Sequence, residues 1–534
     1  MRKTSKPKLI DRILAHPRWA RLRRPASDAR GSVAVQFAIV LVPLTIVAFG
    51  TFDYNRASIA HQELQDALDA ATLMAARSNT ATTDAQLNAI GQPAMTTNLL
   101  SLHDGTLTSS NFHMAAPYIT GTATMTVNPL VANLWTGGNM TVTATAQVVR
   151  TINNVEVALV LDNTGSMSAT LGSGGTTKIA ALKTAATSMV NQLQTAATNS
   201  GKANAVKIAL VPYTMTVNVG STYQNASWIS PGLPSAYGTD IFATAGTNRF
   251  TLFAQMGVAW AGCVESRPSP YDVTEAPPTA ATPGTMYVPF FAPDEPGTTS
   301  ANNWNSQTWY NNYLNDVSAS GTWSVRQGYV PKYNTHTFVN SGNNSVGYAY
   351  GPNSGCAVQP LTRLTTNFSA INTSISNMTV GGDTDITQGL QWGWHAVSPN
   401  GPFNDGVPYT QTDTNKIIVL MTDGEQSNVS NNNSNASYYS GLGYIWQGRL
   451  GMVSGSTATR DAAMTAKLTT ECNNVKAAGI TVYVVVLYDP PNDQSAVEAC
   501  ATNSNDLYVV TDTSQLTNVF NAIAGSIQNL RLTR

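Results

Sequence analysis

Three short polar segments of the chain carry oxygen-bearing side chains in patterns suited to holding a metal ion. In the first, Asp162, Thr164 and Ser166 occupy alternate positions of one loop. The second contains Thr384, within GGDTDITQGL, and the third contains Asp423, within LMTDGE. Carboxylate and hydroxyl oxygens suit Mg²⁺, Ca²⁺ or Mn²⁺, whereas zinc and copper favour imidazole and thiolate. These five residues are therefore a candidate divalent-metal site, with Mg²⁺ or Ca²⁺ expected.

The elements that would position this site are predicted from apolar runs. Residues 155–161 (VEVALVL) lead into Asp162, and residues 417–421 (IIVLM) lead into the loop of Asp423. Continuous runs of this kind are typical of strands buried on both faces of a parallel sheet. A third run, residues 480–487, follows a predicted helix. This alternation predicts a doubly wound α/β fold with a mostly parallel sheet, whose carboxyl edge brings both aspartates into one crevice.

A simpler interpretation needs no metal. In it, Asp162 and Asp423 only cap loops, and Thr384 caps the helix that follows it. The two interpretations differ in what they predict for a partner. An ion held by so few protein charges keeps an open coordination position, which an acidic residue of another protein can occupy.

The three segments, in this order, resemble the metal-ion-dependent adhesion site of a von Willebrand factor type A domain. That family usually has Ser where this chain has Thr164, so a hydroxyl oxygen is retained. The resemblance implies that Ser166 and Thr384 contact the ion directly or nearly so. It implies that Asp162 and Asp423 act partly through water, and that Thr164 completes the loop. A type A domain would then occupy residues 151–534.

A long insertion is expected within this domain, at about residues 221–360, because type A domains are usually much shorter than residues 151–534. It is rich in proline, and its tryptophans include Trp260, Trp304, Trp309 and Trp323. Two interpretations stay open: a carbohydrate- or protein-binding surface, or a family-typical subdomain without a ligand of its own. The low-complexity stretch at residues 428–437 (NVSNNNSNAS) is predicted to be a mobile loop.

The N-terminal region has the charge pattern of a membrane anchor. Residues 1–30 carry ten Lys and Arg against two Asp, a charge of +8, which leaves −9 for the rest of the chain. In the segment 31–53, only the last residue, Asp53, is charged. A helix of twenty apolar residues is about 30 Å long, which is the thickness of a bilayer core. Positive charges before a span favour a cytoplasmic N-terminus and an exported body. A cleaved signal peptide is the alternative.

Residues 54–150 follow a pilin-like pattern. Residues 54–77 are predicted to form a helix with an apolar stripe of Ala60, Leu64, Leu68, Ala71 and Met74. Residues 80–150 then change to a Thr/Val alternation, which predicts a small antiparallel sheet.

The anchor, the HQELQDALDAATLMAAR that follows it and the ending SIQNLRLTR are similar to TadE/TadG-like proteins of bacterial tight-adherence (Flp-type) pilus systems. An anchor joined to a type A domain is typical of TadG. The resemblance implies a single-pass inner-membrane protein with a cytoplasmic N-terminus and a periplasmic or extracytoplasmic body. Pseudopilins of these systems have Glu five residues after a cleavable Gly. This chain has Gln36 at that distance from Gly31, so processing stays open.

The four cysteines, Cys263, Cys356, Cys472 and Cys500, all follow the anchor. None stands in a CxxC motif or near a histidine, so zinc is not expected. An even number in an exported body indicates disulfides, for which three pairings are possible. We favour Cys263–Cys356 and Cys472–Cys500, since each pair lies within one segment, although the sequence does not fix the connectivity.

The sequence favours a binding protein over an enzyme, because familiar catalytic motifs such as HExxH and GxSxG are missing. A hydrolase would have to draw a general base from Asp383, Asp385 or Glu425. The acidic body and the absence of a basic cluster beyond the arm argue against nucleic acid, and no small-molecule substrate is expected. We expect a component of pilus assembly that binds other pilus-assembly or pilin-like proteins. The alternative is a cell-surface adhesin or receptor for extracellular protein or carbohydrate.

Overall fold

The structure is a computed structural model that describes residues 32–530 with internal gaps. The gaps are residues 79–80, 82, 100–104, 116–117, 131–137, 150–152, 173–174, 201, 235–236, 238, 243–245, 297–310, 316–321, 339–349, 425, 432 and 488–494. The basic arm, Trp304, Trp309 and Glu425 therefore lie outside the described residues. The chain divides into two compact units, residues 1–150 and residues 151–534, each described by itself below.

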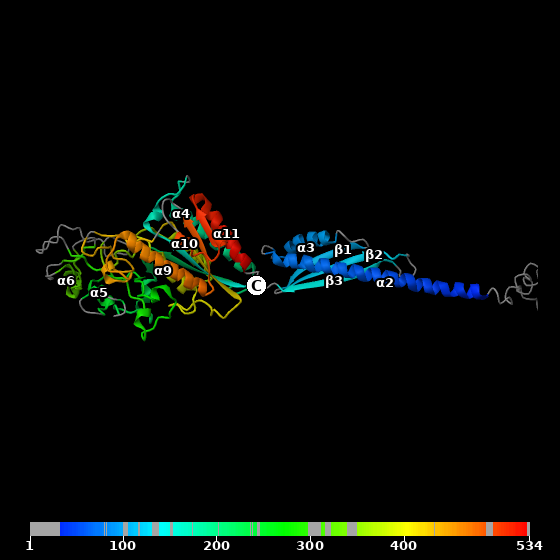
Figure 1. Cartoon of the computed structure of the whole chain (residues 1–534), viewed down its shortest axis with the longest axis horizontal. Coiled ribbons are helices and arrows are strands. Elements are labelled where there is room, and N and C mark those ends of the chain that lie inside the picture. The colour runs from blue at the N-terminus through cyan, green and yellow to red at the C-terminus, as the bar shows by residue number, and fades with distance from the viewer. Residues whose placement is uncertain are drawn as a thin grey trace, which may run out of the picture. The chain divides into compact units, whose positions relative to one another are not determined.

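The first unit packs two helices on one face of a small sheet (Figure 1). Strands β1, β2 and β3 are antiparallel and adjacent in that order, as the Thr/Val alternation predicted. Its elements are α2 (Ser32–Arg77), α3 (Asp84–Asn98), β1 (Thr106–Ala115), β2 (Tyr118–Val127) and β3 (Met140–Val149).

Two details of the first unit correct the sequence interpretation. The helix α3 lies within residues 80–150, where only strands were expected. It begins with a capping box in which the side chains of Thr83 and Gln86 each bond the other residue's backbone N–H, a local signal that the Thr-rich composition masks. Along α2, Met74 is exposed and Ala75 is buried in its place, because the buried stripe advances four residues beyond Ala71.

The N-terminal half of α2 is apolar and exposed. Among the described residues, this helix is the one that is long and apolar enough to cross a membrane, with a mean hydropathy of 2.4 in its most apolar window. Val40 and Leu44, for example, are 59% and 63% exposed. An apolar surface of this length in water would be costly, so the helix suits a single membrane span.

The second unit is a mixed α/β structure with a sheet of mostly parallel strands. Its strands are β4 (Asn154–Asp162), β5 (Val206–Tyr213), β6 (Val217–Asn218), β7 (Cys263–Val264), β8 (Thr362–Thr365), β9 (Thr414–Thr422), β10 (Thr481–Leu487) and β11 (Leu507–Val510). Its helices are α4 (Lys178–Asn199), α5 (Arg249–Gln255), α6 (Trp323–Gln327), α7 (Phe368–Ser376), α8 (Ile386–Val397), α9 (Thr457–Ala477), α10 (Ser495–Glu498) and α11 (Leu516–Leu530).

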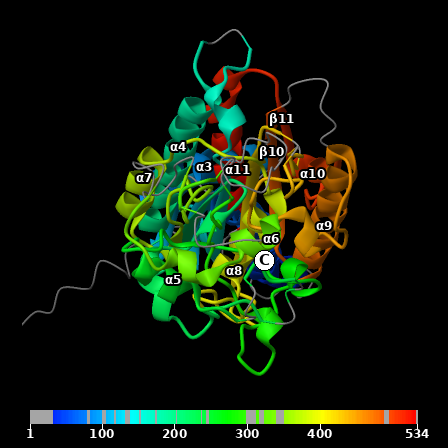
Figure 2. The ribbon, with the colours of Figure 1, turned by 90° about the vertical axis from the view of Figure 1, so that its left-hand side faces the viewer.

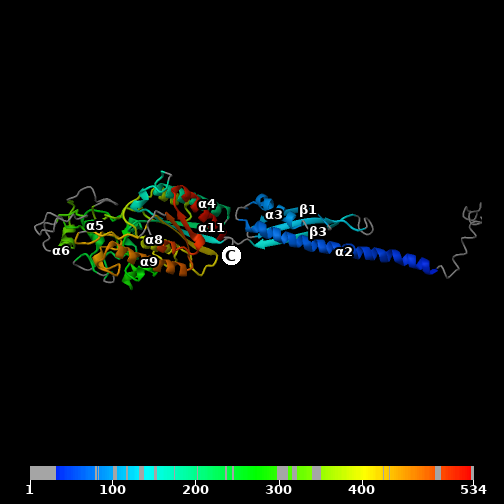
Figure 3. The ribbon, with the colours of Figure 1, turned by 45° about the horizontal axis from the view of Figure 1, so that its top comes forward.

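The sheet order is β11-β10-β9-β4-β5-β6-β7, with β8 paired to β5. The pairs from β11 to β5 are parallel, and β6, β7 and β8 pair in the antiparallel sense. Both faces are covered: α4 and α11 lie on one side and α8 and α9 on the other (Figure 3), and α4 packs beside α7 (Figure 2). Successive residues of β4 enter the two cores alternately, with Leu159 in one and Val160 in the other. This two-sided burial explains the continuous apolar runs.

The described part of the predicted insertion is well packed, and its interior contains polar side chains that bond one another. Glu265, which is fully buried, bonds Arg249, Arg449 and Tyr439 from three separate segments. Of the tryptophans predicted there, Trp260 is buried and Trp323 packs edge-on against Trp446. These contacts tie the insertion to the chain after β9.

The stretch at residues 428–437 is not the mobile loop that its composition predicted. Asn435 is fully buried, and its amide donates to Glu295 at 3.2 Å and to Gln327 at 3.0 Å. The Trp446 indole donates to the Asn435 side-chain oxygen at 3.1 Å. The asparagines therefore satisfy buried polar groups of the insertion, a role that a low-complexity pattern does not reveal.

Glu471, on α9, is a buried carboxyl group. It is fully buried, and among the described residues neither of its carboxyl oxygens has a hydrogen-bond partner. Burial, together with the nearby Asp272 and Asp385 carboxylates, raises the pKa of Glu471 well above its ordinary value of 4.5. Folding therefore favours the protonated form of this side chain.

Glu471→Gln is expected to remove a pH-dependent loss of stability. Because the folded state binds the extra proton, the wild-type free energy of unfolding falls as pH rises from 4.5 toward the raised pKa, relative to that of the variant. The difference grows by about 1.4 kcal/mol per pH unit in that interval. Denaturant unfolding between pH 4.5 and 7.5 measures it, with the partly exposed Glu498→Gln as the control. Parallel pH profiles for wild type and Glu471→Gln would contradict this assignment.

Candidate metal centre

The register of the sheet brings the two predicted carboxylates together. In the β4–β9 pairing, Leu161 lies opposite Met421, so that Asp162 ends one strand where Thr422 ends its neighbour. Asp423 follows Thr422 directly. Parallel strands place their carboxyl ends at the same edge, and both carboxylates consequently meet there.

Asp162 is held by three hydrogen bonds in a fully buried position. Its Oδ1 accepts from the Thr164 backbone N–H at 2.8 Å. Its Oδ2 accepts from the Thr422 hydroxyl at 2.8 Å and from the Tyr213 hydroxyl at 3.3 Å. Burial and the neighbouring Asp423 carboxylate raise the pKa of Asp162 to about 6. The side chain is thus fixed in orientation but still ionised at neutral pH.

Asp423 is joined to the first loop by a chain of hydroxyl groups. The Ser166 hydroxyl donates to Asp423 Oδ1 at 2.7 Å, and the Thr164 and Ser166 hydroxyl oxygens are 2.9 Å apart. The other carboxylate oxygen, Oδ2, accepts from the Lys178 ammonium at 3.0 Å. Asp162, Thr164, Ser166 and Asp423 therefore form one connected cluster.

Thr384 lies in the loop that packs beside this cluster. The Gly165 N–H donates to Gly382 O at 3.0 Å, and the Thr384 carbonyl accepts from the Ser427 N–H at 3.0 Å. Gly382 has a φ of +75°, a backbone conformation that residues other than glycine rarely adopt. Glycine at this position therefore permits the close contact between the two loops. Among the described hydrogen bonds, none joins the Thr384 hydroxyl to the other four residues. The structure places Thr384 next to the cluster without linking it directly.

This donor set fits a hard divalent ion. It combines two carboxylates and up to three hydroxyls on three loops, and oxygen ligands of this kind suit Mg²⁺ or Ca²⁺. Among the described residues, there is no group of three or more His, Cys, Asp or Glu that could hold a metal ion. The residues that would hold an ion are Asp162, Thr164, Ser166, Thr384 and Asp423.

Three contributors were not predicted from the sequence: Lys178, Tyr213 and Thr422. Lys178 carried a usable signal, because a lysine in the first turn of a helix opposes the helix dipole and therefore needs another reason to be there. Its position as the first residue of α4, directly after the N-cap Thr177, is of this kind. Tyr213 lies opposite Asp162 in the β4–β5 register, which the sequence alone does not give.

Of the described residues that a hydrolase might use, Asp385 caps a helix. Asp385 is the N-cap of α8, where its carboxylate accepts from the Gln388 N–H at 3.1 Å, and burial raises its pKa to about 6. Burial and the nearby Asp461 carboxylate raise the pKa of Asp383. No hydrogen bond among the described residues connects either side chain to Asp162 or Asp423.

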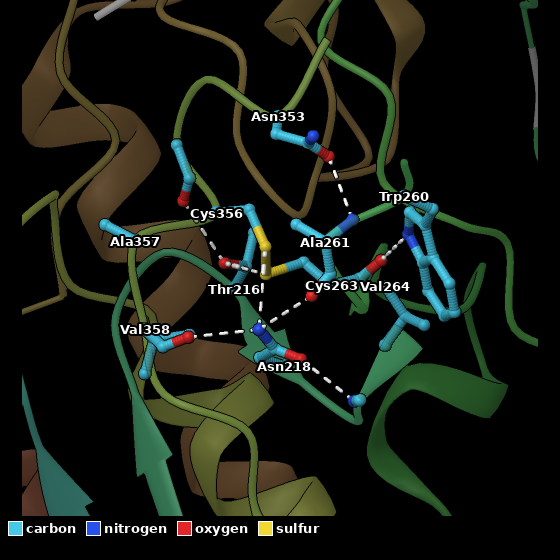
Figure 4. The surroundings of a disulfide bond; sticks show 12 residues. Thr216, Asn218, Trp260, Ala261, Cys263, Val264, Asn353, Cys356, Ala357 and Val358 are labelled. Atoms are coloured by element: carbon cyan, nitrogen blue, oxygen red, sulfur yellow. Dashed lines mark hydrogen bonds between the residues drawn. A yellow bond between two sulfur atoms is a disulfide. The ribbon is translucent and has the colours of Figure 1, made fainter. Parts of the chain in front are cut away.

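Two disulfide bonds lie in the second unit. Cys263 is bonded to Cys356 and Cys472 to Cys500, the two pairs that the sequence favoured. Around the first, the Asn218 amide donates to Ala261 O and Val358 O, each at 3.1 Å, and therefore links the chain segments of both cysteines (Figure 4). This disulfide anchors the insertion at the edge of the sheet, on strand β7.

Comparison with known families identifies the anchor region. The family described as TadE-like protein matches residues 31–73. These residues are a TadE-like segment. The segment covers the apolar half of α2 and continues into the half that packs on the small sheet of the first unit. The match therefore lies on the helix that is suited to a single membrane span.

Several solved structures are similar to this chain at low identity. The pilus adhesin SpaC from Lactobacillus rhamnosus GG is 11% identical, with a TM-score of 0.33, over 80% of this chain and 35% of that chain. The vWF domain of the type V pili tip protein Mfa5 from Porphyromonas gingivalis is 12% identical, with a TM-score of 0.32, over 72% and 97% of the two chains. The PilB minor pilin from Streptococcus sanguinis is 11% identical, with a TM-score of 0.31, over 80% and 79%.

This chain thus spans about a third of the length of SpaC. Since all three TM-scores lie below 0.5, we base no functional statement on these structures. Comparison with curated proteins gave no match.

Proposed function

We propose that this chain is a membrane-anchored, extracytoplasmic component of a Flp-type (tight adherence) pilus assembly apparatus. The observation that carries the proposal is the TadE-like segment at residues 31–73, located on a helix suited to crossing a membrane. The basic residues 1–30 would stay in the cytoplasm of an inner-membrane protein, and the second unit would lie outside it.

In this proposal the second unit is a von Willebrand factor type A domain, and its metal-ion-dependent adhesion site binds an acidic residue of a partner protein. Support comes from the cluster of Asp162, Thr164, Ser166 and Asp423 at the carboxyl edge of the parallel sheet. A bound Mg²⁺ or Ca²⁺ would supply a positively charged attachment point for a carboxylate. The protein's own residues orient the hydroxyls: Asp162 fixes the first loop through the Thr164 N–H, and Asp423 fixes Ser166.

We propose a binding protein and not an enzyme. Asp385, the best-placed candidate base, is engaged as a helix cap. The expected partners are other pilus-assembly or pilin-like proteins, with no nucleic acid and no small-molecule substrate.

Cell fractionation combined with labelling of intact cells tests the proposed location. An assembly component is expected in the inner-membrane fraction, inaccessible to a membrane-impermeant label until the outer envelope is opened. A deletion strain is expected to lose most surface pili in electron micrographs. Labelling of the intact protein on whole cells, with normal pilus numbers in the deletion strain, would instead favour the adhesin alternative.

A further inference from the structure

Lys178 stands in the metal centre without an evident reason in its own helix. It is the first residue of α4, where the helix dipole disfavours a positive charge. Its side chain is nevertheless only 3% exposed and is paired with Asp423, which is fully buried at the side chain. Burial of a charge is costly unless a specific partner compensates for it, so the position of Lys178 depends on the centre and not on helix formation.

Backbone contacts hold Lys178 close to the loop that carries Asp162, Thr164 and Ser166. The Lys178 N–H donates to Ala169 O at 2.8 Å, and Thr170 pairs with Thr177 in an isolated β-bridge. These two contacts join the residues that follow Ser166 to the start of α4. As a result, the loop that would hold the ion also fixes the lysine.

The two oxygens of Asp423 are occupied by different donors. Ser166 donates to Oδ1, and Lys178 donates to Oδ2. Without an ion, the carboxylate is therefore already paired with a positive charge inside the protein. A divalent ion that interacts with Asp423 has to share that carboxylate with the ammonium group, and the two like charges repel each other.

We propose that Lys178 is an internal cation of the metal centre that weakens binding of the ion alone and favours an acidic ligand. The formal charges of Asp162, Asp423 and Lys178 add up to −1. Adding a divalent ion brings the total to +1, and a partner carboxylate at the open coordination position neutralises it. Ion and partner then bind cooperatively, since each compensates for the charge of the other. This inference rests on the proposed function and specifies how the site selects its partner.

Calorimetric titration of the full-length, detergent-solubilised protein with Mg²⁺ or Mn²⁺ tests this inference. Lys178→Met is expected to bind the ion at least about tenfold more tightly than wild type, because the competing charge is removed. Lys178→Arg keeps the charge and is expected to stay within about threefold of wild type. Lys183→Met is the matched control on the same helix, where Lys183 donates to Ser376 O at an exposed position.

Acetate serves as a probe of the acidic ligand. At a fixed concentration of acetate, ion binding by wild type is expected to tighten, and the gain is expected to be smaller in Lys178→Met. Equal or weaker ion binding by folded Lys178→Met, with measurable binding by wild type, would overturn the role of Lys178 and leave the metal site standing. If no folded variant binds an ion, both the inference and the metal-dependent function fail.

Discussion

Asp423→Ala is expected to remove divalent-ion binding and to lower the free energy of unfolding by about 3–5 kcal/mol. The carboxylate connects the Ser166 hydroxyl to the Lys178 ammonium, and both charged side chains are buried. Substitution with alanine removes a proposed ion ligand and deprives the buried lysine of that carboxylate. Calorimetric titration measures the first effect, with a loss of affinity of at least about 100-fold, and denaturant unfolding measures the second.

Two further variants separate these effects. Asp423→Ala/Lys178→Met removes both members of the buried pair and is expected to regain most of the lost stability without regaining ion binding. Ser166→Ala removes the hydroxyl that donates to Asp423 Oδ1 and is expected to lose ion binding, with a fall in the free energy of unfolding of about 1–3 kcal/mol. Wild-type ion affinity in Ser166→Ala would show that the ion, if bound, is held elsewhere.

Val40→Asp/Leu44→Asp is expected to release the protein from the membrane. Both residues lie on the exposed apolar half of α2, one helical turn apart. An aspartate near the centre of a membrane helix costs about 2.5–3.5 kcal/mol, so the pair costs about 5–7 kcal/mol. The variant should move from the carbonate-resistant membrane fraction to the soluble fraction or be degraded.

Val40→Ile/Leu44→Ile is the control for this substitution and is expected to behave as wild type. If Val40→Asp/Leu44→Asp remained fully in the membrane fraction, the helix would not be the anchor. The aspartate pair avoids added positive charge, which could alter topology instead of insertion.

The parts of the fold that were predictable are those set by local pattern. The runs before Asp162 and Asp423 are strands because both of their faces are buried, and the mixed α/β fold with a mostly parallel sheet is confirmed. In contrast, α3 begins at a capping box within a region whose Thr-rich composition favours strands. Local polar signals of this kind have to be weighed against composition.

The candidate site was predictable to the extent that it depends on strand ends. Asp162 and Asp423 lie where parallel strands would place them, whereas Lys178 enters the site through a tertiary contact between α4 and the loop after β9. The burial of Asn435 has the same origin, because its partners Glu295 and Gln327 are more than a hundred residues away in sequence. Long-range polar pairing of this kind leaves no periodicity in the sequence.

The central claim is that the metal centre serves pilus assembly. It is tested most directly by counting surface pili in electron micrographs of a deletion strain that re-expresses either wild type or Ser166→Ala at matched levels. We expect wild type to restore pili and Ser166→Ala, which should fold and insert normally, to leave the cells largely bare. If the isolated Ser166→Ala variant binds no ion and cells that express it are nevertheless fully piliated, the metal centre does not serve pilus assembly.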